Sequence, residues 1–401
     1  MSAASEQKVA TGVMAVGRMA LVGVGTGGCR AVAAMSEGWD DGPSMYAVDT
    51  DSRALIAAGG VANHLAIGAT LTRGLSAGGD MQVGRLAVEE ASESLRGIFA
   101  GMELVFLVTT LGGGTGSGAA PTVARLAREA GAMVLAVATL PFPFEGAATM
   151  AQARKALGDL RDEADVVAVV PNERLFESQR SATIEDAYRA SDQMLGLGVY
   201  AIWKLLTRRS YLNDIDASVL RNVVRAVGGT CVFGVGEAQG GDKAGDAVRR
   251  ALASPLFGGG LALGEAAAAV VAVVGGPDLT FLEVERAMET VHNAMRKDAR
   301  LFSGTVVDDN WRGACAVTIL AAESWTEDDV ADIKGAAAAG KDAPATAPGP
   351  RRKRQAGQAQ QHVLSFEATG KGIFKDVEPT NLDGQDMDLP TYLRKGMVIE
   401  K

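Results

Sequence analysis

Two glycine-rich loops contain the residue types best suited to hold phosphate groups. The first loop comprises Gly23, Gly25, Thr26, Gly27 and Gly28, and the second comprises Gly112, Gly113, Gly114, Thr115, Gly116 and Ser117. Glycine lets the backbone turn its N–H groups towards an anion, and a helix that follows adds its positive N-terminal end. A Walker-type lysine is absent from the sequence, so amide dipoles and Mg²⁺ must meet the phosphate charge. The loops predict one ligand with several phosphates.

The first loop also fits the pattern of a dinucleotide-binding protein. Gly23, Gly25 and Gly28 satisfy G-x-G-x-x-G, and Asp49 lies at about the distance of a ribose-binding acid. An NAD-dependent Rossmann enzyme is therefore the rival interpretation. Against it, such an enzyme needs one glycine loop, and the stronger loop here is the second.

Apolar runs predict the strands that must position these loops. Strands are expected at residues 19–22, 44–48, 104–108, 133–138 and 166–170. Helical patterns follow at residues 30–35, 81–99 and 119–131. Strands that alternate with helices indicate an α/β domain with a parallel sheet, whose ligand lies at the carboxyl ends of the strands.

A long helix and a second α/β region follow. Residues 184–206 are apolar on several sides, which predicts a buried helix. Beyond it we expect helices at 217–227, 243–253 and 281–296, and strands at 230–235, 268–274, 301–307 and 314–320. Residues 335–361 are rich in Ala, Gly, Pro and Gln, a composition typical of a flexible linker.

Composition excludes several classes of protein. The net charge of −9 over 401 residues argues against general affinity for nucleic acid. Cys29, Cys231 and Cys315 are too far apart in sequence to suggest a disulfide framework or a zinc site, and no metal-binding motif is present. No apolar run approaches the ~20 residues that a transmembrane helix needs. We therefore expect a cytoplasmic protein without a transmembrane segment.

The motifs together resemble FtsZ, the prokaryotic relative of tubulin. Residues 112–118 resemble the tubulin/FtsZ signature loop, residues 72–74 and 77–78 the γ-phosphate loop, and residues 141–146 the ribose loop. These loops also occur in the family's order, and the resemblance covers nearly the whole chain. It implies a tubulin/FtsZ-like fold, in which a central helix joins a parallel-sheet GTP-binding domain to a second α/β domain.

The resemblance implies GTP or GDP as the ligand, with Mg²⁺ bound to the nucleotide. Beyond the two glycine loops, it places at the nucleotide Gly78, Glu145, Asn172, Tyr188, Asp192 and Gln193. Asn172 would contact guanine and Tyr188 would stack on it. The residue that reads guanine stays open between Asp192 and Gln193, because an aspartate can accept from both N1–H and the 2-amino group whereas an amide has one acceptor oxygen.

Some positions depart from the family pattern. Asp49 stands where the family usually has Asn, and Thr149 stands where an Arg is expected. In FtsZ, two acids three residues apart reach into the next subunit's nucleotide site and polarise the attacking water. One alignment of residues 213–219 keeps Asp216 and puts Val219 in the second acid's place, and the other keeps neither acid.

The candidate catalytic residues in this inter-subunit loop are Asp216 and Asp214. The competing interpretation makes them the N-cap of the helix that begins at Ala217. We expect a slow, assembly-dependent GTPase, because one of two cooperating acids is missing. A GTP-binding scaffold that does not hydrolyse is the alternative.

The resemblance divides the chain into six parts. They are a flexible tail at 1–17, the GTP-binding domain at 18–185, the central helix at 186–209, a second α/β domain at 210–325 that contacts the next subunit, a flexible linker at 326–373 and a partner-binding peptide at 374–401.

The partners follow from the same resemblance. We expect a divergent FtsZ paralogue that forms head-to-tail filaments with itself, could co-assemble with another FtsZ, and serves cell division or membrane remodelling. The segment from Asp388 to Lys395 would bind a membrane-anchor or regulator protein. This contact would recruit the cytoplasmic protein to the inner face of a membrane.

Overall fold

The computed structural model describes residues 18–36, 39, 42–175, 181–208, 230–254, 257, 261–322, 381–382 and 385–386. The chain divides into two compact units, Met1–Gly335 and Ala336–Lys401. In the second unit, the described residues form two short antiparallel strands, β11 (Asn381–Leu382) and β12 (Gln385–Asp386). All other described elements belong to the first unit.

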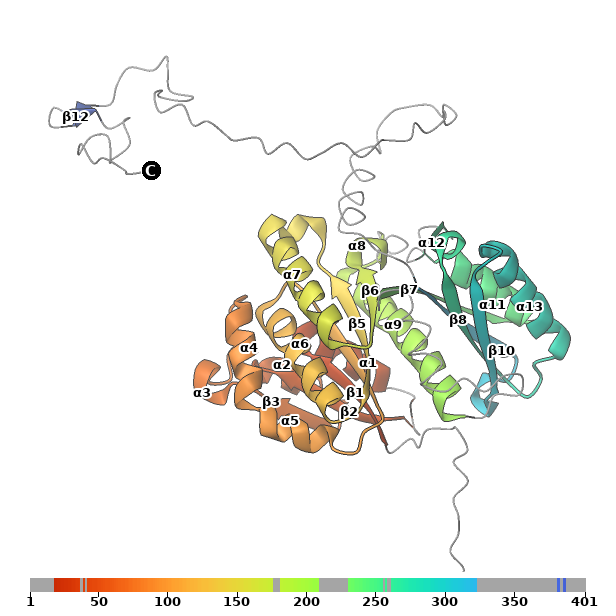
Figure 1. The fold of residues 1–401 in the computed structure, drawn as a ribbon, viewed down its shortest axis with the longest axis horizontal. Helices are drawn as coiled ribbons and strands as arrows, with labels where there is room; N and C mark the ends of the chain where they lie inside the picture. Colours follow the sequence, from red (N-terminus) through yellow and green to blue (C-terminus); the bar gives the residue numbers. More distant parts are fainter. Residues whose placement is uncertain are drawn as a thin grey trace, which may run out of the picture. The chain divides into compact units, whose positions relative to one another are not determined.

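A ten-stranded sheet runs through the first unit, with the order β3-β2-β1-β4-β5-β6-β7-β10-β8-β9 (Figure 1). Its strands are β1 (Met19–Val24), β2 (Ser44–Asp49), β3 (Asn63–Ala66), β4 (Leu104–Thr110), β5 (Met133–Leu140), β6 (Val166–Pro171), β7 (Thr230–Gln239), β8 (Ala268–Gly275), β9 (Arg300–Val307) and β10 (Ala314–Ala322). Neighbouring strands from β3 to β7 pair in parallel, whereas β10 is antiparallel to β7 and β8. Because β1, β4, β5 and β6 are parallel, their carboxyl ends lie at one edge of the sheet.

Helices cover both faces of this sheet. They are α1 (Gly25–Ser36), α2 (Ser52–Ala57), α3 (Ala69–Thr72), α4 (Met81–Glu90), α5 (Ser92–Phe99), α6 (Gly114–Glu129), α7 (Ala147–Glu163), α8 (Asn172–Leu175), α9 (Ile184–Thr207), α11 (Lys243–Leu252), α12 (Leu261–Glu265) and α13 (Phe281–Ala294), with the 3₁₀ turns η2 (Pro143–Glu145) and η5 (Asp309–Trp311). Successive strand side chains alternate between the faces. Leu21 packs in the core that includes α1 and α9, and Val22 packs in the core under α4 to α7. Both faces are buried, which explains the continuous apolar runs.

Helix α9 lies between the two parts of the sheet (Figure 1). It contacts α1 on one side and β8 and β10 on the other. Its Trp203 is 1% exposed and stacks on Trp39 with ring centroids 5.5 Å apart. Lys204 of the same helix forms an ion pair with Asp308, the residue before η5. Helix α9 therefore connects the two parts of the sheet through both apolar and polar contacts.

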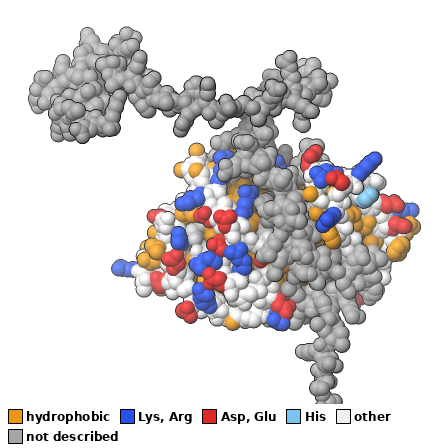
Figure 2. All heavy atoms as spheres, in the orientation of Figure 1, with side chains coloured by type: hydrophobic (Ala, Val, Ile, Leu, Met, Phe, Trp, Pro, Cys, Tyr) orange, Lys and Arg blue, Asp and Glu red, His pale blue; other side chains and the backbone are white. Residues whose placement is uncertain are grey.

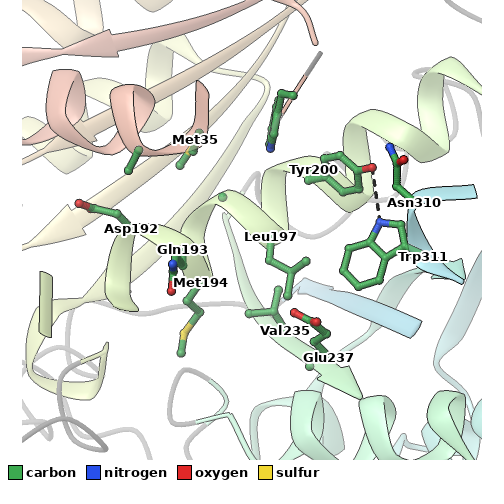
Figure 3. A pocket seen from close by; sticks show the side chains of 14 residues that line it. Met35, Asp192, Gln193, Met194, Leu197, Tyr200, Val235, Glu237, Asn310 and Trp311 are labelled. Carbon is green, nitrogen blue, oxygen red and sulfur yellow. Dashed lines mark hydrogen bonds between the residues drawn. The ribbon is translucent and has the colours of Figure 1, made fainter. Parts of the chain in front are cut away.

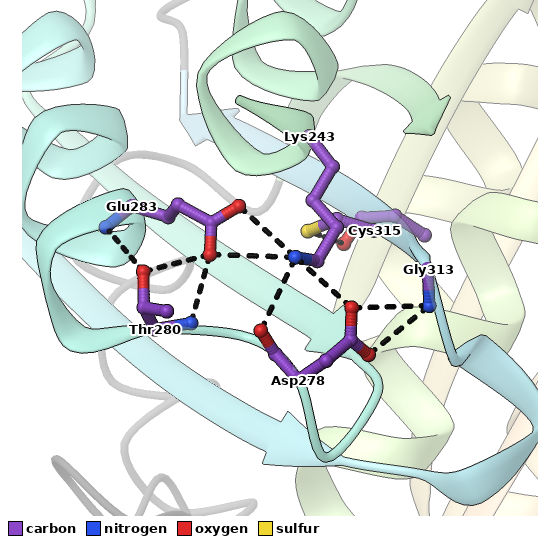
Figure 4. Close-up of polar contacts among 7 residues, drawn as sticks. Lys243, Asp278, Thr280, Glu283, Gly313 and Cys315 are labelled. Carbon is purple, nitrogen blue, oxygen red and sulfur yellow. Dashed lines mark hydrogen bonds and ion pairs between the residues drawn. The ribbon is translucent and has the colours of Figure 1, made fainter. Parts of the chain in front are cut away.

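A buried lysine ties together the far part of the fold (Figure 4). Lys243 Nζ at the start of α11 lies 3.0 Å from Glu283 Oε1 on α13 and 3.2 Å from Asp278 Oδ2. The Asp278 carboxylate also accepts from the Gly313 N–H before β10. Glu283 caps its own helix by accepting from the Thr280 N–H. These charged side chains therefore have a structural role, because their contacts hold α11, α13 and β10 together.

The predicted parallel α/β architecture is confirmed, and some predicted elements differ in detail. The predicted helix 81–99 is interrupted at Ala91, and α6 begins at Gly114 inside the glycine loop rather than at Ala119. Strand β3 and helix α7 had no predicted counterpart. The two predicted α/β regions share one sheet, because β6 pairs with β7 through Val167↔Thr230 and Ala168↔Cys231. The predicted helix 217–227 lies outside the described residues.

The surface carries charges of both signs. Figure 2 shows acidic and basic side chains interspersed on the visible face of the described residues. Among those residues, none of the helices combines the length and the apolar character that crossing a bilayer requires.

Candidate functional site

The two glycine loops meet at the carboxyl ends of β1 and β4. Gly25 directly follows β1, has φ of +75°, and begins α1. A Cβ atom on Gly25 would lie 2.8 Å from the backbone N of Gly116, which is closer than such contacts allow. Only glycine combines this dihedral with this approach. The loops therefore pack backbone against backbone, and two helix N-termini converge on one place.

This place suits an anion. Neither α1 nor α6 has an acidic residue in its first turn, so the positive ends of both helices are uncompensated by their own side chains. Gly113 is exposed, and a Cβ atom on it would meet nothing within 4 Å. The loop thus presents open backbone to solvent at the N-terminus of α6, as a phosphate-binding loop requires.

Asp49 is turned inward and holds the loops together. Its carboxylate, 1% exposed, accepts hydrogen bonds from the Thr26 hydroxyl at 3.0 Å and from the N–H groups of Thr50 at 2.7 Å and Asp51 at 3.2 Å. The hydroxyls of Thr50 and Thr115 are 2.8 Å apart and link the end of β2 to the second loop. A carboxylate used in this way is not presented to a ribose, which argues against the dinucleotide interpretation.

A third loop, residues 77–80, packs against the second. The predicted ligand residue Gly78 is exposed there, and Gln152 of α7 donates from Nε2 to the carbonyls of Gly79 at 2.9 Å and Gly112 at 3.0 Å. Gln152 thus fixes the distance between the two loops. Sequence reasoning missed it because nothing in the sequence had indicated α7.

Ser117 plays a structural part within the second loop. Its side chain is fully buried, and its hydroxyl accepts from the Gly112 N–H at 2.8 Å. This hydrogen bond joins the two ends of the glycine run and closes the loop.

A cavity of about 180 Å³ opens beside the first loop. The predicted residues that line it are Gly27, Glu145, Asn172, Tyr188 and Asp192. They come from α1, η2, α8 and α9, so the fold gathers them from distant parts of the sequence. Glu145 also accepts from the Phe142 N–H at 2.8 Å, which shapes the turn after β5.

Asp192 lines both this cavity and the neighbouring cleft, to which Gln193 also belongs. The Asp192 side chain is 5% exposed and lines the cavity beside Tyr188. Gln193 is exposed and lines a second cleft of about 740 Å³, between α9 and the end of β7 (Figure 3). Burial raises the pKa of the Asp192 carboxyl, and the hydrogen bond and charge of Arg30 oppose that shift.

Arg30 is a cavity residue that sequence reasoning missed. Its Nε lies 2.9 Å from Asp192 Oδ2, and its guanidinium carbon lies 4.2 Å from the centre of the Tyr188 ring. The signal was available as a basic residue two positions after the first glycine loop. It was read only as part of a helix.

The predicted catalytic residues Asp214 and Asp216 lie outside the described residues. The three cysteines are described, and all are buried and free. Burial raises the pKa of the Cys29, Cys231 and Cys315 thiols to about 12 each. They are therefore protonated at neutral pH and unsuited to nucleophilic chemistry.

Comparisons with known proteins match both parts of the first unit. Residues 18–180 match the GTPase domain of the Tubulin/FtsZ family, and residues 229–324 match the C-terminal domain of the FtsZ family. Cell division protein FtsZ 1 of Archaeoglobus fulgidus is 40% identical over 301 residues, which cover 75% of this chain and 80% of that protein.

The chain belongs to the tubulin/FtsZ family. Members of this family are GTPases, so the chain is a GTPase that binds GTP and GDP. The FtsZ identity expected from the loop motifs is confirmed.

Solved structures agree with this assignment. An FtsZ dimer of M. jannaschii has a TM-score of 0.67 at 32% identity, covering 76% of this chain and 88% of that one. CetZ2 of Haloferax volcanii, solved as a GTPγS-bound protofilament, has a TM-score of 0.63 at 25% identity, covering 80% of this chain and 97% of that one.

Proposed function

We propose that this FtsZ-family protein binds GTP at the meeting point of α1 and α6, polymerises head to tail and hydrolyses GTP slowly at the subunit interfaces. The observation that carries the site assignment is the convergence of two helix N-termini beside a cavity lined by Tyr188 and Asp192. Helix N-termini favour phosphates, and the aromatic ring and carboxylate suit a purine base.

Mg²⁺ would bind chiefly through the nucleotide. Among the described residues no group of three or more His, Cys, Asp or Glu side chains could hold a metal ion. The Asp49 carboxylate already accepts from the hydroxyls of Thr26 and Thr50 and from the N–H groups of Thr50 and Asp51. Phosphate oxygens and water supply the ligands that Mg²⁺ prefers. When bound, Mg²⁺ would neutralise phosphate charge.

Hydrolysis would require a second subunit. We assign the polarisation of the attacking water to Asp216, with Asp214 as the second candidate, because in FtsZ the corresponding loop carries this function to the next subunit's nucleotide. A positioned carboxylate contributes typically 10²–10⁴-fold to such a step. The loss of one of two cooperating acids would slow hydrolysis without weakening nucleotide binding.

The test is phosphate release measured against protein concentration, for the unaltered protein and for Asp216→Ala. The rate per molecule should rise where filaments form, and the variant should hydrolyse more slowly while its filaments persist longer. A rate per molecule that stays constant below the concentration of assembly would rule out the inter-subunit mechanism. Filaments without phosphate release would favour the non-hydrolysing scaffold.

The names of the relatives support the proposed cellular role. FtsZ 1 of A. fulgidus is named as a cell division protein, and the CetZ2 structure is a protofilament. We assign this chain to the same cytoplasmic filament systems, in division or membrane remodelling, with self-association and co-assembly with another FtsZ as its interactions. The segment from Asp388 to Lys395 would connect the filament to a membrane-bound partner.

A further inference from the structure

A single glutamine of α7 joins two of the loops at the proposed phosphate site. Gln152 donates from Nε2 to the carbonyl oxygens of Gly79 at 2.9 Å and Gly112 at 3.0 Å. Only the amino group of the amide can face two acceptors, because its own oxygen would be repelled by both carbonyls. The two N–H bonds of Gln152 therefore hold the third loop, residues 77–80, beside the second loop.

The two loops depend on this glutamine to different degrees. Gly112 in the second loop is also held through its N–H, which donates to the Ser117 hydroxyl at 2.8 Å. Among the described residues, the bond from Gln152 is the only hydrogen bond that Gly79 makes. Gly78 and Gly79 have φ of +62° and +83°, and a Cβ atom on either would meet nothing within 4 Å. Because such glycines lose much conformational freedom when they are ordered, loss of Gln152 would free the tip of the third loop and leave the second loop closed.

The third loop lies at the far end of the site from the cavity proposed for the base. That cavity adjoins the first loop through Gly27, and its lining includes no residue of the described third loop. The first loop packs on the second at Gly25 and Gly116. The second loop packs on the third at Gly114 and Ala77. A nucleotide with its base in the cavity therefore extends its phosphates across the first and second loops, and its terminal phosphate comes nearest the third.

We propose that Gln152 prepares the third loop to bind the terminal phosphate of a nucleoside triphosphate. This inference rests on the proposed function. Gly78 and Gly79 are exposed, and glycine lets backbone N–H groups approach a phosphate closely. A loop that is already held in place loses less conformational entropy when the ligand binds. A diphosphate ends before the third loop, so its affinity does not depend on Gln152, which acts as a positioning residue.

The experiment measures the dissociation constants of GTP and GDP for the full-length protein. They are obtained by displacement of a fluorescent GTP analogue, with Mg²⁺ present and below the protein concentration of assembly. Gln152→Met keeps the length of the side chain and removes both donors without adding charge. The variant should bind GTP roughly tenfold more weakly and GDP within about twofold of the unaltered protein, because only the triphosphate uses the two hydrogen bonds. A merely structural role would lower both affinities together.

Gln82→Met is the matched control. Gln82 is exposed on α4, two residues beyond the third loop, and within the described part of the chain its side chain makes no hydrogen bond. The same substitution there should leave the ratio of the two affinities unchanged. Gln152→Ala also lacks the donors and favours a helix, so it must reproduce the effect of Gln152→Met.

Each outcome decides between the claims. A loss of GTP affinity alone supports the role of Gln152. Equal losses for both nucleotides, no loss for either, or the same change of ratio in Gln82→Met overturn that role while the proposed function stands. If the unaltered protein binds neither nucleotide, the proposed function falls and the inference falls with it. Should Gln152→Met fail to fold, Gln152→Ala decides by the same comparison.

Discussion

Two neighbouring glycines of the second loop differ in what a methyl group would meet. A Cβ atom on Gly114 would lie 2.9 Å from the Ala77 Cβ and from the backbone N and O of Asp80, whereas one on Gly113 would meet nothing within 4 Å. Gly113 has φ of −83°, which alanine adopts freely. A methyl group on Gly114 would therefore strain the loop itself. A methyl group on Gly113 would obstruct only the ligand.

We expect Gly113→Ala to lower GTP affinity at least tenfold with a stability loss below about 1 kcal/mol, because the methyl group projects into the space assigned to phosphate. Gly114→Ala should lower affinity too, but with about 1–3 kcal/mol of destabilisation from overpacking. Calorimetric titration with GTP and urea unfolding of both variants provide the measurements. Unchanged GTP affinity in Gly113→Ala would show that the phosphates lie elsewhere.

At the scale of elements, α9 is fastened to the second part of the sheet by a buried ion pair. The side chains of Lys204 and Asp308 are 5% and 12% exposed, and the Tyr200 hydroxyl lies 3.1 Å from Asp308 Oδ2. Burial acts to raise the pKa of the Asp308 carboxyl, but hydrogen bonds from Lys204 and from the Asn310 N–H outweigh it and hold the pKa below its ordinary value of 3.8. The ionised carboxylate is thus stabilised by folding.

We expect Lys204→Met to lower the free energy of unfolding by about 3–5 kcal/mol at pH 7, because it leaves a buried carboxylate without its cation. A depressed folded pKa gives stability that is present above the ordinary pKa and lost as the pH falls through the folded value. The difference between variant and unaltered protein should therefore shrink below pH 3.8. Urea unfolding of both proteins at pH 7 and below pH 3.8 measures this difference in the free energy of unfolding.

Two controls make this prediction specific. Arg189→Met removes an exposed pair and should cost less than about 1 kcal/mol. Lys204→Met combined with Asp308→Leu removes both charges and should recover much of the loss. A single variant as stable as the unaltered protein would show that the pair does not fasten α9.

At the scale of the whole molecule, the folded unit and the end of the chain are expected to act separately. The family matches end at residue 324, and the chain divides into compact units at Gly335. Deleting residues 384–401 should therefore leave GTP-dependent sedimentation of filaments unchanged, while a labelled copy leaves the membrane in its native cell. Scrambling residues 388–395 at constant composition is the control for sequence-specific docking. A truncated protein that localises like the full-length one would refute the docking role.

Local sequence was enough to predict the two glycine loops between a strand and a helix. A strand, a glycine run and a helix are contiguous in the chain, and the steric freedom of glycine is a property of the residue itself. The alternation of apolar strand-like runs with helical patterns predicted the parallel sheet. Such strands are apolar throughout because helices cover both faces of the sheet. Segments such as β3 are too short and too exposed to show a pattern, and its four residues include three exposed ones.

Only the tertiary structure decided how the cavity beside the first glycine loop is lined. Arg30 and Asp192 are 162 positions apart, and their contact depends on how α1 packs against α9. The rotation of α9 about its axis decided that Asp192 reaches this cavity as well as the cleft, whereas Gln193 lines the cleft, because neighbouring residues on a helix point about 100° apart. That rotation is set by buried residues such as Leu195 and Trp203 packing against the sheet, which no local pattern around Asp192 records.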